Sequence, residues 1–282
     1  MRISHQMLHN QTINRMQQNA SRMAETYEQA ASGKKVVRAS DSPQAAVDAM
    51  KLHGQLAEME QFKANQDKGV LFMDELDSKL QNMSSILQRI NELGIQANSD
   101  VLFNGERDLL NKELGELTEE LKSIASHSIQ GEFLFTGSAA TGLAPGQETS
   151  PAKHILAARG TAVEVSIPAE TVFGPNNELF DMLSTMKTAL DNNEHVDLGA
   201  IKESSDRVAD ALALTGARKN RLDSIQNRME DSKIEQKALL SKVEDIDFAE
   251  VLTKLKSEEA VYQASLAATS KLYTTSLVDY LR

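Results

Sequence analysis

Apolar residues recur at three- and four-residue steps over most of the chain, which is the spacing of one face of an α-helix. The clearest run lies within residues 44–97 and comprises Met73, Leu76, Leu80, Met83, Leu87 and Ile90. A second run follows the turn at residues 98–105 and comprises Leu110, Leu114, Leu117, Leu121 and Ile124. Two such runs joined by a short turn predict an antiparallel helical hairpin.

The two ends of the chain carry narrower apolar stripes. Residues 2–31 predict one amphipathic helix, and an almost unbroken helix is predicted from Leu198 to the end. A lone helix with so narrow a stripe is marginal in water, because packing supplies most helical stability. We therefore expect the stripes to pack in an assembly. They comprise Ile3, Met7, Ile13, Met16, Met23 and Tyr27 at one end, and Leu252, Leu255, Tyr262, Leu266, Tyr273, Leu277 and Tyr280 at the other.

A helix connection is predicted at residues 33–43. Gly33 is expected to end the first helix, because glycine readily takes the left-handed conformation found there. Pro43 suits the first position of the next helix, with Ser42 capping the free amides ahead of it. Asp41 lies in the same Ser-Asp-Ser-Pro stretch, so we predict a helix, a loop and a new helix.

Residues 131–177 change character, because glycine and proline become frequent. The segment 133–135 (Phe-Leu-Phe) predicts a short strand. Val163, Val165 and Ile167 alternate with less apolar residues, which is typical of a half-buried strand. Residues 154–158 are its expected hairpin partner across Arg159 and Gly160.

The expected fold is mainly α: an elongated antiparallel coiled-coil helical bundle with a small inserted β-rich module. We expect residues 1–35 and 250–282 to form terminal coiled-coil helices for assembly. Residues 36–130 and 178–249 would form the core of the bundle, and residues 131–177 the surface module.

Composition narrows the function. The net charge of −11 argues against nucleic acid or an anionic membrane as the main partner. The absence of cysteine excludes disulfides, thiolate metal sites and cysteine nucleophiles. Neither a cleaved signal peptide nor a membrane-spanning apolar run is recognisable. We expect a cytoplasmic protein, or one exported without a cleaved signal.

Catalytic and cofactor motifs are not found, so we expect no enzyme, no cofactor and no metal. The best metal candidate comprises Asp191, Glu194, His195 and Asp197, which we interpret as helix caps and solvated surface. Asp197 should cap the helix that begins at Leu198. Two alternatives remain open at this point: an enzyme or ligand carrier hidden in the β-rich module, and a soluble coiled-coil adaptor protein.

Several stretches resemble the flagellin superfamily of bacterial flagellar axial proteins, and within it the hook-associated junction family. They are Met1-Arg2-Ile3-Ser4, Ala31-Ser32-Gly33-Lys34-Lys35-Val36-Val37, Ser40-Asp41-Ser42-Pro43, Phe133-Leu134-Phe135-Thr136-Gly137, Glu178-Leu179-Phe180-Asp181, Gly216-Ala217-Arg218-Lys219-Asn220-Arg221-Leu222 and Ser276-Leu277-Val278-Asp279-Tyr280-Leu281. Their order and placement make the set specific. Ser42 departs from the family's usual aspartate, and the Pro-Phe usual after Gly137 is missing.

The resemblance implies a structural subunit, exported through the flagellar secretion channel and located outside the cell. It would join the hook to the filament through packing of its terminal helices. Its implied partners are the first hook-associated protein, flagellin, copies of itself in a ring and a flagellar export chaperone, with no nucleic acid and no membrane insertion. A filament flagellin is the nearest alternative.

Overall fold

A computed structural model describes residues 2–99, 104–129, 131–136 and 152–278 of the 282-residue chain. The fold is mainly α, as the sequence predicts, with three small two-stranded sheets among these residues. The chain divides into two compact units, one of residues 1–57 with 232–282 and one of residues 58–231. Two long helices, α2 (Pro43–Ala97) and α6 (Leu198–Glu244), contribute to both units. Gly54 and Gly69 do not interrupt α2.

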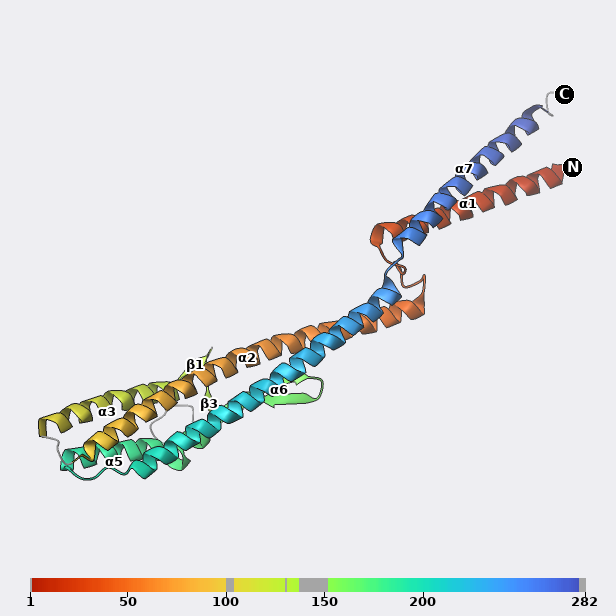
Figure 1. Cartoon of the computed structure of the whole chain (residues 1–282). Helices are drawn as coiled ribbons and strands as arrows, with labels where there is room; N and C mark the ends of the chain where they lie inside the picture. Colours follow the sequence, from red (N-terminus) through yellow and green to blue (C-terminus); the bar gives the residue numbers. More distant parts are fainter. Residues whose placement is uncertain (1, 100–103, 130, 137–151, 279–282) are drawn as a thin grey trace. The chain divides into compact units, whose positions relative to one another are not determined.

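The first unit is built around a pair of terminal helices. Helix α1 (Arg2–Ser32) lies beside α7 (Phe248–Val278), as Figure 1 shows in red and blue. The pair is antiparallel, because the Nδ2 of Asn19 donates to the Oγ of Ser265 at 3.2 Å while Gly33 lies next to Phe248. The first turns of α2 and the last turns of α6 complete this unit.

The prediction of an almost unbroken helix from Leu198 onward is wrong at residues 245–247. Helix α6 ends at Glu244, and α7 begins at Phe248. The Oδ1 of Asp247 accepts hydrogen bonds from the amides of Ala249, at 2.9 Å, and Glu250, at 3.3 Å. A side chain that satisfies these free amides starts a new helix. The Asp247-x-x-Glu250 spacing was the overlooked sequence signal.

The second unit is a helical bundle of α3 (Asn104–Ala125), α5 (Glu178–Asn192) and the neighbouring parts of α2 and α6 (Figure 1). Helices α2 and α6 run antiparallel, because contacts pair Lys63 with Glu230 and Lys219 with Asp74. The predicted hairpin of α2 and α3 is present, with Arg89 paired to Glu113. The heptad residues of both runs are buried, except Leu117, which is partly buried.

The β-rich segment contains three short pairings. Strands β1 (Ser128–Ile129) and β2 (Glu132–Phe133) are antiparallel, and β3 (Phe135–Thr136) pairs in parallel with β6 (Ile167–Pro168). The predicted hairpin is confirmed as β4 (His154–Ala158) and β5 (Thr161–Glu164), turning at Gly160 with a φ of +71°.

The prediction of one strand over residues 133–135 is wrong. Strand β2 ends at Phe133 and β3 begins at Phe135. The amide of the buried Leu134 between them donates to the carbonyl of His127 at 3.2 Å, next to the β1–β2 pairing. Short helices α4 (Ala169–Phe173) and η2 (Pro175–Asn177) then lead to α5. Phe173 lies between Phe135 and Phe180, with ring centroids 5.1 and 5.6 Å away.

The β4–β5 hairpin is seated on the long helices. The Nε2 of Gln66 donates to the carbonyl of Ala157 at 2.5 Å, and Arg218 pairs with Glu164 at 2.6 Å. A Cβ on Gly69 would lie 2.3 Å from the Cδ1 of Ile155, so α2 and the hairpin approach as closely as a glycine allows. The inward residues of this segment belong to the common hydrophobic core, among them Ile155, Val163, Val165 and Ile167. The functional division predicted from the sequence, with its boundaries at 35, 131, 177 and 250, stays a prediction.

Candidate assembly surface

The predicted stripe on α1 lies partly against α7 and partly in water. Ile13, Met16 and Met23 are half-buried. Met7 is 73% exposed and Tyr27 is 64% exposed, while the neighbouring Thr26 is buried. Ile3 lies in α1, but its side chain is outside the described part of the structure.

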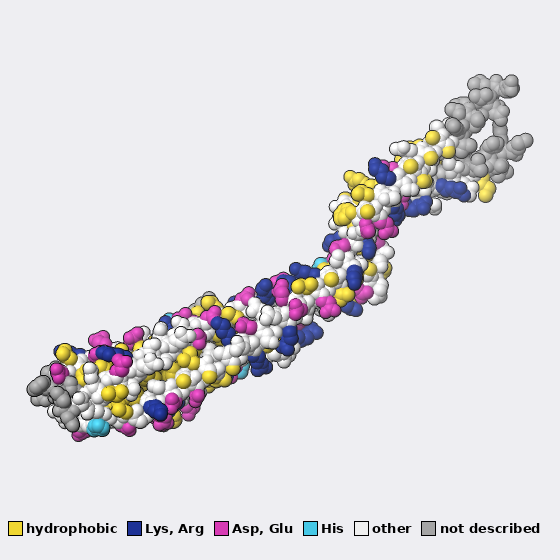
Figure 2. Space-filling view, in the orientation of Figure 1, with side chains coloured by type: hydrophobic (Ala, Val, Ile, Leu, Met, Phe, Trp, Pro, Cys, Tyr) yellow, Lys and Arg dark blue, Asp and Glu magenta, His cyan; other side chains and the backbone are white. Residues whose placement is uncertain are grey.

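The stripe on α7 is divided in the same way. Leu255 and Tyr262 are half-buried, whereas Leu252 is 51% exposed and Leu266 is 44% exposed. Phe248 and Val261 also expose much of their side chains, and Figure 2 shows hydrophobic surface over the described part of the α1–α7 pair. Tyr273 and Leu277 lie in the helix without described side chains, and Tyr280 falls outside the described residues.

The contact between α1 and α7 contains polar groups. Asn19 and Ser265 are hydrogen-bonded across it, and Thr26 is buried on α1. The Oε2 of Glu258 on α7 is buried without a hydrogen-bond partner among the described residues. Hydrophobic stabilisation scales with the apolar area removed from water, so a partly polar contact contributes little. The pair therefore leaves much of its apolar surface in water.

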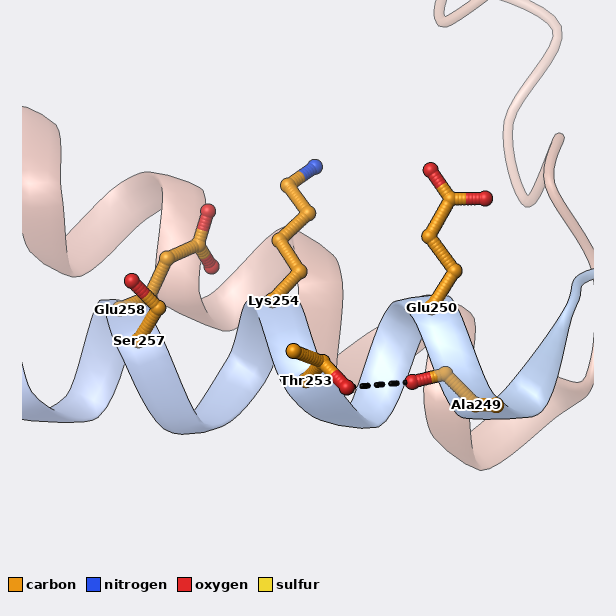
Figure 3. A pocket seen from close by; sticks show the side chains of 6 residues that line it. All are labelled: Ala249, Glu250, Thr253, Lys254, Ser257 and Glu258. Atoms are coloured by element: carbon orange, nitrogen blue, oxygen red, sulfur yellow. Dashed lines mark hydrogen bonds between the residues drawn. The ribbon is translucent and has the colours of Figure 1, made fainter.

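A shallow groove runs along the first turns of α7 (Figure 3) and is lined by Ala249, Glu250, Thr253, Lys254, Ser257 and Glu258. The Oγ1 of Thr253 donates to the carbonyl of Ala249 at 2.7 Å. Glu250 and Lys254 extend from the same side of the helix in this view. Small hydroxyl side chains and charged side chains therefore line this groove.

The helix connection has the geometry expected at Gly33 and Pro43. Gly33 has a φ of +73° directly after α1, and Pro43 is the first residue of α2. The side-chain cap predicted for Ser42 is wrong: its carbonyl accepts from the amide of Ala46 at 2.9 Å, and its hydroxyl has no hydrogen bond to the described residues. Asp41 instead stabilises the loop, since its Oδ2 accepts from the amide of Arg38 at 2.9 Å.

The structure adds a contact that the sequence reasoning missed, between residues 33–35 and residues 244–246. The amide of Lys35 donates to the carbonyl of Glu244 at 2.7 Å, and the amide of Ile246 donates to the carbonyl of Gly33 at 3.1 Å. The Glu244 carboxylate also contacts the Nζ of Lys34 and, at 2.9 Å, the Nε2 of His53. The hydrogen bond from Lys34 and that from His53 lower the pKa of Glu244 despite its partial burial. We call this arrangement the clasp.

The predicted cap at Asp197 is confirmed, because its Oδ1 accepts from the amide of Gly199 at 2.8 Å at the start of α6. Asp191 instead accepts a hydrogen bond from the side chain of Asn111 on α3. Within the described ranges no group of three or more His, Asp or Glu side chains could hold a metal ion. Over the same ranges, no helix is long and apolar enough to cross a membrane.

Two family models match this chain. The model of the bacterial flagellin N-terminal helical region matches residues 3–140, and that of the C-terminal helical region matches residues 198–281. Together the two matches cover well over half of the chain and include both terminal helices. The chain belongs to the bacterial flagellin family. It is therefore an extracellular component of the bacterial flagellum.

Curated relatives of this flagellin-family chain match it over nearly its whole length. Flagellar hook-associated protein 3 of Salmonella typhimurium is 25% identical over 317 residues, with all of both chains covered. The flagellin of Bacillus subtilis is 25% identical over 288 residues, covering 95% of this chain and 94% of that protein.

Solved structures share the fold. A putative flagellar hook-associated protein from Vibrio parahaemolyticus aligns with a TM-score of 0.65 at 17% identity, over 73% of this chain and 100% of that one. FlgL of Bacillus cereus aligns with a TM-score of 0.58 at 17% identity, over 68% of this chain and 99% of that one.

Proposed function

We propose that the chain is the structural subunit that joins the flagellar hook, through the first hook-associated protein, to the flagellin filament. The observation that carries the proposal is the match to hook-associated protein 3 of Salmonella typhimurium, which covers both chains entirely. The subunit works by packing of its terminal helices and catalyses no reaction. A filament flagellin is the second candidate, favoured by the match to the flagellin of Bacillus subtilis.

The exposed apolar residues of α1 and α7 support assembly through these helices. Met7, Tyr27, Leu252 and Leu266 lie in water when α1 and α7 pair only with each other. Burying them against neighbouring subunits contributes roughly 25 cal/mol per Å² of apolar surface. Copies of this chain in a ring, the first hook-associated protein and flagellin would each cover part of this surface, and an export chaperone would cover it before assembly.

Electron microscopy of cells that lack the protein tests the junction role. We expect intact hooks without filaments, with flagellin released into the medium, and normal filaments on complementation. Filaments of normal length in the deletion strain would contradict the proposal.

Polymerisation of the purified chain separates the two candidates. A junction subunit should form no long filaments by itself, because it joins two different lattices. Long filaments of this chain alone would favour the flagellin alternative. A stable dimer through the terminal helices in dilute solution, without binding to the hook tip, would favour a soluble adaptor.

A further inference from the structure

The Glu244 carboxylate joins three segments of the first unit. Glu244 is the last residue of α6, and its side chain contacts Lys34 in the loop after α1 and His53 in α2. Its side chain is only 13% exposed, whereas the side chains of Lys34 and His53 remain about half exposed. Its backbone carbonyl accepts from Lys35, so main chain and side chain hold the same loop.

A carboxylate is poorly placed at this position unless other groups compensate it. The C-terminal end of a helix carries partial negative charge, which disfavours a glutamate there. The ammonium of Lys34 and the imidazole of His53 supply the compensation, and both come from segments nearly 200 or more residues away along the chain. The stability of α6 alone therefore does not explain a glutamate at this position. Its contacts with Lys34 and His53, which are distant in the sequence, do explain it.

Some polar contacts of the N-terminal connection stay within it. Arg38 pairs with Glu28, and the Nε2 of Gln29 donates to the carbonyl of Lys35 at 3.1 Å, both within residues 28–38. The backbone pairing of residues 33–35 with 244–246 does cross, as does a long contact of 3.4 Å from the Nζ of Lys35 to the carbonyl of Lys242. The Glu244 carboxylate also contacts His53 of α2. Among the described residues of the clasp, this is the one contact with α2.

We propose that Glu244 is a positioning residue that fixes the direction in which the α1–α7 pair leaves the adjoining turns of α2 and α6. Residues 245–247 and the loop after Gly33 are the non-helical points at which this direction could change. The value of a fixed direction for assembly rests on the proposed function, since neighbouring subunits must meet these helices at one angle. The angle itself belongs to the isolated chain and can be measured there.

The chain has no cysteine, so two introduced cysteines can carry spin labels without background. Lys237→Cys on α6 and Ser257→Cys on α7 replace exposed residues on the two sides of the break. In the full-length monomer we expect a narrow distance distribution. Glu244→Gln, which keeps the shape and removes the charge, should lose that narrow distribution. Hydrogen-exchange protection of the Lys35 and Ile246 amides should fall about tenfold, as expected for a lost hydrogen bond to a charged group.

Glu235→Gln is the matched control, because it makes the same change on the same helix at an exposed carboxylate. We expect it to leave both readouts unchanged. Lys34→Ala removes the other partner of the ion pair. It should broaden the distance distribution although Glu244 itself is unchanged.

The proposal would be overturned if the distance distribution kept its width in both Glu244→Gln and Lys34→Ala. It would also be overturned if Glu235→Gln broadened the distribution as much as Glu244→Gln. Because these measurements use the monomer, their outcome does not depend on whether the chain joins hook to filament.

Discussion

Gly33 ends α1 with a φ of +73°, a conformation that costs other residues roughly 1–2 kcal/mol. Its nearest neighbour for an added Cβ is the ring of Phe248 at 3.5 Å, so backbone conformation, not space, limits the site. We expect Gly33→Val to lower the free energy of unfolding by about 1 kcal/mol or more, measured by denaturant titration. Pro43→Ala should change it little.

Gly54→Ala is the control for that measurement. Gly54 lies inside α2, and in the described part of the structure no atom lies within 4 Å of an added Cβ. Alanine should there raise stability by about 1 kcal/mol, because it is the better helix former. If Gly54→Ala lowered the free energy of unfolding as much as Gly33→Val, the positive φ of Gly33 would not be the cause of the lower stability.

The clasp should depend on pH through Glu244. Its pKa is lowered below the ordinary value of 4.5, mainly by the hydrogen bond from Lys34, so the ionised form stabilises the folded state. That contribution is present above the ordinary carboxyl pKa and is lost as the pH falls through the lower folded pKa. The groups that face the carboxylate are Lys34 and His53, with Lys242 and Asp245 beside it in the chain.

We expect exchange protection of the Lys35 and Ile246 amides to exceed that in Glu244→Gln at neutral pH. The two proteins should converge in strong acid, once the pH has fallen through the lowered folded pKa of Glu244 and its carboxylate is protonated and uncharged as well. A difference that persists unchanged into strong acid would show that the charge of Glu244 is not what holds the clasp.

The β4–β5 hairpin depends on the absence of a side chain at Gly69. An added Cβ there would lie 2.3 Å from Ile155 Cδ1 and 3.3 Å from Leu222 Cδ2. We expect Gly69→Ala to lower the free energy of unfolding by about 1–2 kcal/mol through overpacking. Gly115→Ala, in open space on α3, should not lower it. Adding Ile155→Val, which removes the clashing methyl group, should recover part of the loss; no recovery would argue against this clash.

The loop at residues 141–150 should tolerate shortening, in contrast to the strands that follow it. It lies outside the described residues, and its glycines and prolines still predict a surface loop. We expect deletion of these residues to leave export and motility intact. Val163→Asp, by contrast, places a charge in the core and should prevent folding. Loss of motility from the loop deletion alone would mean that the loop contacts a partner.

The long helices and the β4–β5 hairpin could be predicted because their signals are local. Apolar spacing of three and four residues identified α2 and α3, and alternation identified β5. The break at residues 245–247 was missed because a continuous stripe outweighed one capping aspartate. The burial of Thr26 in place of Tyr27 depends on how α1 turns toward α7, which spacing alone does not determine.

The clasp could not be predicted from the sequence. Lys34 and His53 lie 210 and 191 residues from Glu244, so no spacing pattern links them. The predicted assembly residues share two stripes in sequence, but the structure separates half-buried members such as Met16 from exposed ones such as Leu252. Their role in assembly stays a prediction.

In the isolated subunit we expect the turns of α1 and α7 that lie far from the clasp to exchange their amide hydrogens rapidly, whereas the turns next to the clasp stay protected. The α1–α7 pair buries polar groups and leaves Met7 and Leu252 in water, so it offsets little of the ordering entropy, roughly 1–2 kcal/mol per residue. Hydrogen exchange on the purified monomer measures this. Slow exchange across both ends in dilute solution would show that they fold without partners.

Removal of residues 250–282 is the complementary change. Because residues 58–231 form a compact unit with its own core, we expect a soluble, cooperatively folded remainder that cannot join the hook tip. Normal incorporation of the truncated chain would contradict assembly through the terminal helices.

Asn19 and Ser265 are hydrogen-bonded although they lie 246 positions apart in the sequence. During synthesis, the α1–α7 contact is therefore among the last contacts of the chain that can form. At about 5–20 residues per second, a ribosome needs roughly 10–50 s to deliver the partner of α1 after α1 itself has emerged. Contacts of such high sequence separation also form slowly, because closing the intervening loop costs entropy. Throughout that interval α1 has no α7 to pack against, so any factor in the cell that binds the apolar stripe of α1 meets no competition from α7.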